Sequence, residues 1–79
     1  MEFVITRHAR EQMAERDVTA DQIDAVLSNP RWTPFATSNT RYDGVVADGR
    51  RLVVILAERY EVPRVVTVWW YDEERERDG

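Results

Sequence analysis

The alternation of apolar and polar residues predicts two helices in the first part of the chain. The clearest signal is VTADQI at 18–23, where Thr19 can cap a helix and Gln22, three residues later, can reach back to the cap. Asn29-Pro30 then stops this helix. The apolar residues that follow the cap share one face of it, namely Ile23, Val26 and Leu27.

A narrower apolar stripe precedes this helix in RHAREQMAER, residues 7–16. Thr6 can cap a helix over this stretch, whose apolar stripe repeats every four residues at Ile5, Ala9 and Met13. A second row with the same spacing is polar and consists of His8, Gln12 and Arg16. Because only Asp17 and Val18 separate the two helices, we expect a tight helical hairpin.

From residue 41 onward the spacing of apolar residues becomes that of strands. Two apolar runs flank Asp48-Gly49 in RYDGVVADGRRLVVILA, which predicts a hairpin with a two-residue turn. Such a turn pairs Val45 with Leu52. A third strand is predicted by RVVTVWWY at 64–71, and short edge strands by FVIT at 3–6 and TPF at 33–35.

These elements predict the α+β class, with the helical hairpin packed on a three- to four-stranded antiparallel sheet. The length of 79 residues fits a single domain, which we assign to residues 1–72. The remaining residues, 73–79, are charged, and we expect them to form a flexible tail.

The two-residue turn decides which hairpin side chains share a face of the sheet. One face carries Arg41, Asp43, Val45, Leu52, Val54 and Leu56, and the other carries Tyr42, Val46, Arg51, Val53, Ile55 and Ala57. Both sets are largely apolar, yet two short helices can cover only one of them. We therefore expect the uncovered face to be an exposed patch that binds a protein partner through Val45, Leu52, Val54 and Leu56.

Composition excludes several classes of site. The chain has no cysteine and a single histidine, which excludes disulfides and thiolate metal sites. No spacing of acidic residues predicts a metal, and no motif predicts a cofactor. No stretch approaches the roughly 20 apolar residues of a membrane span, and the N-terminus has no signal pattern, so we expect a cytoplasmic protein.

The net charge of −4 is unevenly distributed. The C-terminal DEERERDG holds five acidic residues against two arginines, so the rest of the chain is nearly neutral. Any contact with nucleic acid must therefore be local, because no diffuse basic field is available to attract it. The acidic tail is either simply solvated or shields the arginines from RNA.

His8 is the one residue that can act as a general acid or base near neutral pH without a large change of its pKa. In the first turn of the predicted helix it lies beside Arg7 and Arg10, which together with free backbone amides can bind a phosphate. The alternative is structural, with Arg7 paired to Glu11 and His8 bonded to a neighbouring strand.

Arginine and aromatic residues also meet on the predicted sheet. Arg41 and Arg51 lie on the hairpin, and Trp69 and Tyr71 lie at the end of the last strand. This combination can hold phosphates and stack bases, although aromatic residues in so small a domain are also natural core residues.

Three stretches resemble a small bacterial domain family of unknown function: HAREQMAERDVTADQIDAVLSNP, YDGVVADGRRLVVILAE and RVVTVWWYD. Members of that family open with a His-Ala-x-x-Arg-Met-x-x-Arg-Gly pattern, matched in this chain by His8, Ala9, Met13 and Arg16. Gln12 replaces the usual arginine, and Asp17 replaces the usual glycine, which suggests a less strained turn. The family is in turn similar to the RelE/ParE and BrnT toxins of type II toxin–antitoxin systems.

The similarity implies a RelE-like fold and a metal-independent endoribonuclease or translation inhibitor that a protein antitoxin neutralises. RelE-like RNases bind messenger RNA in the ribosome on the open sheet face, and His8 or Tyr71 would move the proton during cleavage. The resulting catalytic candidates are His8, Arg16, Arg41 and Tyr71. The candidates for phosphate or RNA contact are Arg7, Arg10, Arg51 and Trp69.

A second hypothesis is a non-catalytic interaction module. Its open sheet face would join a homodimer or a dedicated protein partner, while His8 and Arg16 would tie helix to sheet. A gyrase-poisoning activity of the ParE kind is a third hypothesis, which the sequence does not separate from RNA cleavage.

Overall fold

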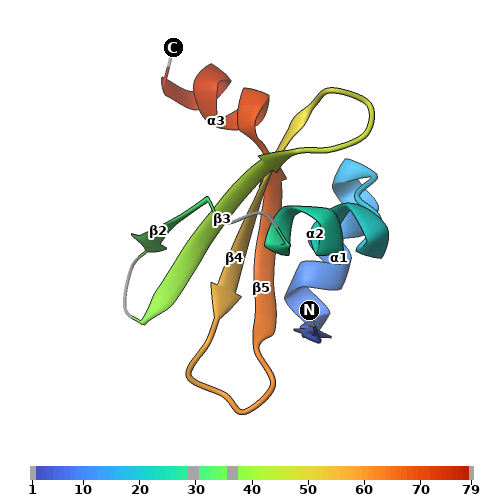
Figure 1. Cartoon of the computed structure of the whole chain (residues 1–79). Coiled ribbons are helices and arrows are strands. Elements are labelled where there is room, and N and C mark those ends of the chain that lie inside the picture. The colour runs from blue at the N-terminus through green and yellow to red at the C-terminus, as the bar shows by residue number, and fades with distance from the viewer. Residues whose placement is uncertain (1, 29–30, 36–37, 79) are drawn as a thin grey trace.

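In a computed structural model, which describes residues 2–28, 31–35 and 38–78, two helices pack on one side of a twisted sheet (Figure 1). The helices of the hairpin are α1 (Arg7–Arg16) and α2 (Ala20–Leu27). The remaining elements are β1 (Val4–Ile5), β2 (Trp32–Phe35), β3 (Asn39–Val45), β4 (Arg51–Ala57), β5 (Arg64–Trp70) and α3 (Tyr71–Asp78). The predicted α+β class is confirmed.

The sheet is open and has the strand order β1-β5-β4-β3-β2. Its four longer strands pair with one another in antiparallel fashion, as predicted. The two-residue β1 adds a parallel edge to β5, so the whole sheet has five strands and is mixed. Both predicted edge strands are therefore present, one at each side of the sheet.

The caps of the two helices form as their sequences predict. The Thr6 hydroxyl accepts a hydrogen bond of 3.1 Å from the backbone amide of Ala9 at the start of α1. At the start of α2, the Thr19 hydroxyl accepts from the Gln22 amide at 3.1 Å, and the Gln22 side chain accepts from the Thr19 amide at 2.9 Å. Asn29 and Pro30, which we expected to stop α2, lie outside the described residues.

Asp17 ends α1 in the left-handed region, with φ of 56° and ψ of 51°. Glycine adopts this conformation at least cost, whereas aspartate is one of the few other residues that tolerate it. The expectation that Asp17 makes the turn less strained than a glycine would is therefore wrong. The turn keeps the geometry that favours glycine, and Asp17 adopts it.

The turn between β3 and β4 has three residues rather than the predicted two. The Val46 amide donates to the Arg50 carbonyl and the Gly49 amide donates to the Val46 carbonyl, both at 2.9 Å. Gly49 has a φ of +91°, which identifies a type I turn followed by a glycine bulge. Val45 consequently pairs with Arg51 instead of Leu52.

This shift of one residue changes the face on which the side chains of β3 lie relative to those of β4. The predicted partner surface is therefore wrong for three of its four members, because Leu52, Val54 and Leu56 are fully buried in the core. Only Val45 is exposed, at 58%. The two helices and their connection supply the other side of this core, through Ala9, Val18, Ile23, Val26 and Leu27.

A bulge in β5 also changes which of its side chains point into the core. Ile55 pairs with Thr67 but Leu56 pairs with Val65, so Val66 is an extra residue in β5. As a result Val65 joins Val68 in the core beneath the helices. Without the bulge, strict alternation would put Val65 on the opposite face from Val68.

The second face of the sheet is not an exposed apolar patch, contrary to our expectation. Its central residues Val53, Ile55 and Ala57 are at most 1% exposed. The Phe35 ring of β2 lies 6.1 Å from the Trp69 ring of β5, although β3 and β4 separate these two strands. The two aromatic side chains must therefore reach toward each other across the middle of the sheet, where they cover apolar residues beneath them.

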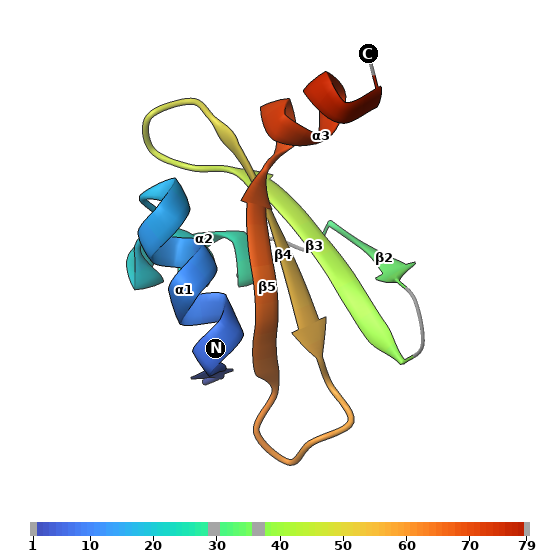
Figure 2. The same cartoon turned by 180° about the vertical axis from the view of Figure 1, so that it is seen from behind.

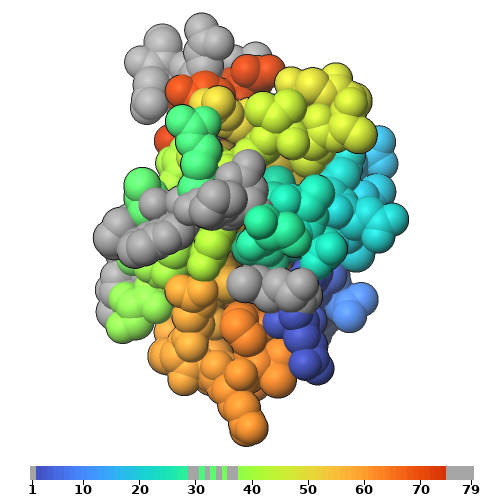
Figure 3. Space-filling view, viewed as in Figure 1, coloured from blue at the N-terminus to red at the C-terminus, as the bar shows by residue number. Residues whose placement is uncertain are grey.

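The chain continues directly from β5 into α3, at the end of the sheet opposite the β4–β5 loop (Figure 2). In the space-filling view the β4–β5 loop lies at the bottom of the molecule, and the β3–β4 hairpin and the start of α3 lie in its upper part (Figure 3). The charged segment that we expected to be a flexible tail is helical as far as Asp78. Among the described residues, no helix is long and apolar enough to cross a membrane.

Replacement of Gly49 by alanine tests the turn that sets the register. An added Cβ would meet no atom within 4 Å, so any effect must come from the positive φ alone. We expect Gly49→Ala to lower the free energy of unfolding by about 1 kcal/mol, measured by chemical denaturation. An unchanged free energy would contradict the left-handed conformation at this position.

Candidate functional site

Five residues that the sequence singled out gather around the first turn of α3. They come from five different elements, and two acidic residues of α3 lie among them. We call this group the α3 cluster, which consists of Arg16, Arg41, Arg51, Trp69, Tyr71, Glu73 and Glu74.

Arg41 of β3 holds the Glu74 carboxylate in a two-pronged contact. Its Nη1 donates to Oε1 and its Nη2 donates to Oε2, each at 2.9 Å. The Arg41 side chain is only 18% exposed, and Asp43 lies 3.7 Å from its Nε. The hydrogen bond to Glu74 raises the pKa of Arg41, and the same bond holds the pKa of Glu74 below its usual value.

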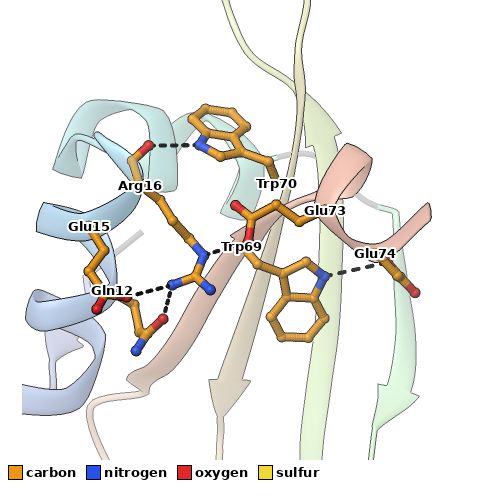
Figure 4. Close-up of polar contacts among 7 residues, drawn as sticks. All are labelled: Gln12, Glu15, Arg16, Trp69, Trp70, Glu73 and Glu74. Carbon is orange, nitrogen blue, oxygen red and sulfur yellow. Dashed lines mark hydrogen bonds and ion pairs between the residues drawn. The ribbon is translucent and has the colours of Figure 1, made fainter. Parts of the chain in front are cut away.

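Arg16, at the end of α1, contacts the neighbouring carboxylate of α3. Figure 4 shows its side chain pointing from α1 toward Glu73, to which its Nε donates at 2.9 Å. Its Nη1 donates to the side chains of Gln12 and Glu15. Gln12, the residue that departs from the family pattern, thus accepts from Arg16, whereas an arginine there would repel it.

Two aromatic side chains border the arginines. The indole N–H of Trp69 donates to Glu74 at 3.4 Å. The Arg51 guanidinium lies 5.3 Å from the centre of the Tyr71 ring, within the range of a cation–π contact. Tyr71 also contributes, as the smallest cause, to the raised pKa of Arg41.

Other predicted site residues lie away from the α3 cluster. His8 is exposed in the first turn of α1 and has no polar partner in the part of the chain that the structure describes. Eight residues separate it from Arg16, which corresponds to about 12 Å along a helix. Arg7 pairs with Glu11 at 3.7 Å, and Arg10 is exposed beside it.

The predicted catalytic residues therefore do not form one site. A general acid or base must lie within hydrogen-bonding reach of the reacting group, so His8 cannot serve a phosphate held at Arg41 without a large rearrangement. Arg16, Arg41 and Tyr71 do lie together around α3.

Residues 5–70 match the model of a protein family described as a domain of unknown function (DUF4258). The chain belongs to this family. No curated protein and no solved structure matches it. The expected membership of a small family of unknown function is thus confirmed, while the similarity to RelE, ParE and BrnT toxins stays a prediction.

The DUF4258 match ends one residue before α3 begins. Arg16, Arg41 and Arg51 therefore belong to the matched domain, and the carboxylates that contact two of them belong to the segment after it. Sequence reasoning considered an acidic tail that shields arginines but identified neither glutamate. The pairing depends on where α3 lies, and the local sequence does not specify that.

In this DUF4258 domain, no group of three or more histidine, aspartate or glutamate side chains within the described ranges could hold a metal ion. The α3 cluster offers guanidinium donors, aromatic rings and a phenol. Such donors suit an oxyanion, and Arg41 in particular presents the flat pair of N–H groups that matches a carboxylate or a phosphate.

The contact between Arg41 and Glu74 should depend on pH in a predictable direction. Because the pKa of Glu74 is lowered, the folded state favours its charged form. The stabilisation is therefore complete above the ordinary titration range of glutamate, and it is lost as the pH falls through the lowered pKa. We expect the carboxyl ¹³C signal of Glu74 to titrate at a lower pH in the native protein than in Arg41→Gln. Equal midpoints in the two proteins would contradict the contact.

Proposed function

We propose that this domain binds single-stranded RNA on the second face of its sheet, as a toxin-derived RNase of the RelE type would. The observation that carries the proposal is the two-pronged contact of Arg41 with a carboxylate. Two oxygens of a carboxylate and two non-bridging oxygens of a phosphodiester present similar acceptors to one guanidinium. Arg41 is thus preorganised for a phosphate.

The surroundings of Arg41 support RNA over a small anion. Arg51 shares this face of the sheet, because it alternates with the buried Val53 and Ile55. Trp69 and Phe35 lie across the same face and Tyr71 lies at its end, and aromatic rings can stack the unpaired bases of a single strand.

The charge of the protein limits the strength of such binding. With a net charge of −4, the protein as a whole repels nucleic acid, so affinity depends on a few local contacts. If Arg41 and Arg51 hold one phosphate each, the logarithm of the binding constant should fall against the logarithm of salt concentration with a slope of about −1.4.

The alternative of an interaction module depended on an exposed apolar face. Because Val53, Ile55 and Ala57 are buried, we do not propose that module. An antitoxin that binds elsewhere on the domain remains compatible with the RNA proposal.

RNA cleavage would use the phenol of Tyr71. The ribose 2′-oxygen forms a bond to the adjacent phosphorus while the bond from phosphorus to the 5′-oxygen breaks. The proton of the 2′-hydroxyl passes to water, and Tyr71 gives its proton to the departing 5′-oxygen and recovers one from solvent. Arg41 and Arg51 would stabilise the negative charge that accumulates on the phosphate.

Binding can be measured by fluorescence anisotropy with a labelled single-stranded RNA of eight nucleotides. We expect Arg41→Ala to weaken binding by about tenfold or more, because a charge-assisted pair of hydrogen bonds is lost. The control variant Arg7→Ala also removes one positive charge, but at the start of α1 and away from the α3 cluster. It should have little effect on RNA affinity. A loss in Arg7→Ala but not in Arg41→Ala would instead support the anion site on α1 that the sequence suggested.

Cleavage has a separate test, in which the products of the same RNA are separated by electrophoresis. We expect Tyr71→Phe to bind RNA like the native protein and to cut it more than about tenfold more slowly, because the general acid is missing. His8→Ala should cut at the native rate. If His8→Ala were inactive and Tyr71→Phe fully active, the role assigned to Tyr71 would be wrong.

A further inference from the structure

The first turn of α3 puts two successive carboxylates on two arginines that are distant in the sequence. Glu74 lies on Arg41 of β3, and Glu73 lies on Arg16 of α1, with N···O distances of 2.9 Å in both contacts. The side chains of Arg41 and Arg16 are 18% and 17% exposed, respectively. Each carboxylate therefore binds a guanidinium group that has little remaining contact with water.

No residue of α3 belongs to the hydrophobic core within the described part of the chain. Its first turn is instead acidic and attaches to the domain through Glu73, Glu74 and the contact of Tyr71 with Arg51. Segments that bury little apolar surface open locally at smaller cost than the core of a domain. A phosphate-bearing ligand could therefore displace α3 without unfolding the domain.

We propose that Glu73 and Glu74 occupy two phosphate subsites, so that α3 and RNA compete for Arg16 and Arg41. This inference rests on the proposed function. It adds Arg16 of α1 to Arg41 and Arg51 as a third phosphate contact, and it makes α3 an internal competitor that keeps the site closed until RNA or another phosphate chain displaces it.

The position of α3 outside the DUF4258 match supports this assignment. The arginines lie within residues 5–70, and the two glutamates follow that segment. The domain thus contains the anion-binding arginines, and the acidic turn that follows it contains the carboxylates that bind to them. A role of α3 in forming the core would require apolar contacts, yet the turn provides two carboxylates.

The test compares Glu73→Gln/Glu74→Gln with Glu2→Gln/Glu61→Gln in the full chain. Both double variants remove two negative charges, but Glu2 and Glu61 are exposed and, within the described residues, form no hydrogen bond or ion pair with an arginine of the α3 cluster. We expect Glu73→Gln/Glu74→Gln to bind the eight-nucleotide RNA about tenfold more tightly than the native protein. Without the two carboxylates, α3 no longer competes with RNA for Arg16 and Arg41. The control should change affinity by less than about twofold, since salt screens distant charges.

A measurement on the native protein makes the test independent of any folding defect in the variant. Hydrogen–deuterium exchange of the amides of residues 72–78 should accelerate when RNA is added, because bound RNA releases α3. Equal affinities in both double variants, or unchanged exchange in α3 with RNA bound, would overturn the competition.

The outcomes separate the two proposals. If Arg41→Ala loses RNA binding while the two double glutamate variants bind RNA with equal affinity, the RNA-binding proposal holds and the proposed competition by α3 is wrong. If neither the native protein nor Glu73→Gln/Glu74→Gln binds RNA, the proposed function itself is wrong.

Discussion

The register between β3 and β4 is the constraint on which both faces of this sheet depend. The turn at Ala47–Gly49 sets it, with Gly49 in a conformation that other residues adopt only at a cost. Because side chains alternate along a strand, a shift of one residue exchanges the two faces of β3 relative to β4. The observed register places Tyr42 in the core and Arg41 beside Ile55, on the same face as Arg51.

Charge, rather than apolar packing, determines the contacts at the end of that face, where β5 leads into α3. The chain is acidic overall, yet three arginines converge near the last residues of β5. A guanidinium with little contact with water, as in Arg16 and Arg41, is costly unless an anion lies beside it. Glu73 and Glu74 supply those anions from within the chain, and the same requirement could be met by phosphates. The arginines of the α3 cluster are therefore neutralised from within the chain, and the proposal is that phosphates can replace the glutamates.

Local sequence reasoning succeeded where the physical cause was local. Thr6 and Thr19 cap their helices through residues three positions away, so a short window contains the whole interaction. It failed at the hairpin, because Asp48-Gly49 is compatible with turns of two or three residues that differ only in backbone conformation. It failed again on the second face of the sheet, where Phe35 and Trp69 meet from opposite sides of two intervening strands.

The sequence by itself determined the order of the main helices and strands, the α+β class and the supply of arginine and aromatic residues. These follow from periodicity, capping and composition, which act over a few residues. Only the tertiary structure decided which arginines meet, that His8 lies apart from them, and that two glutamates of α3 occupy them. Those outcomes depend on strand register, a bulge in β5 and the direction in which the chain leaves the sheet, and each of these results from contacts between distant segments.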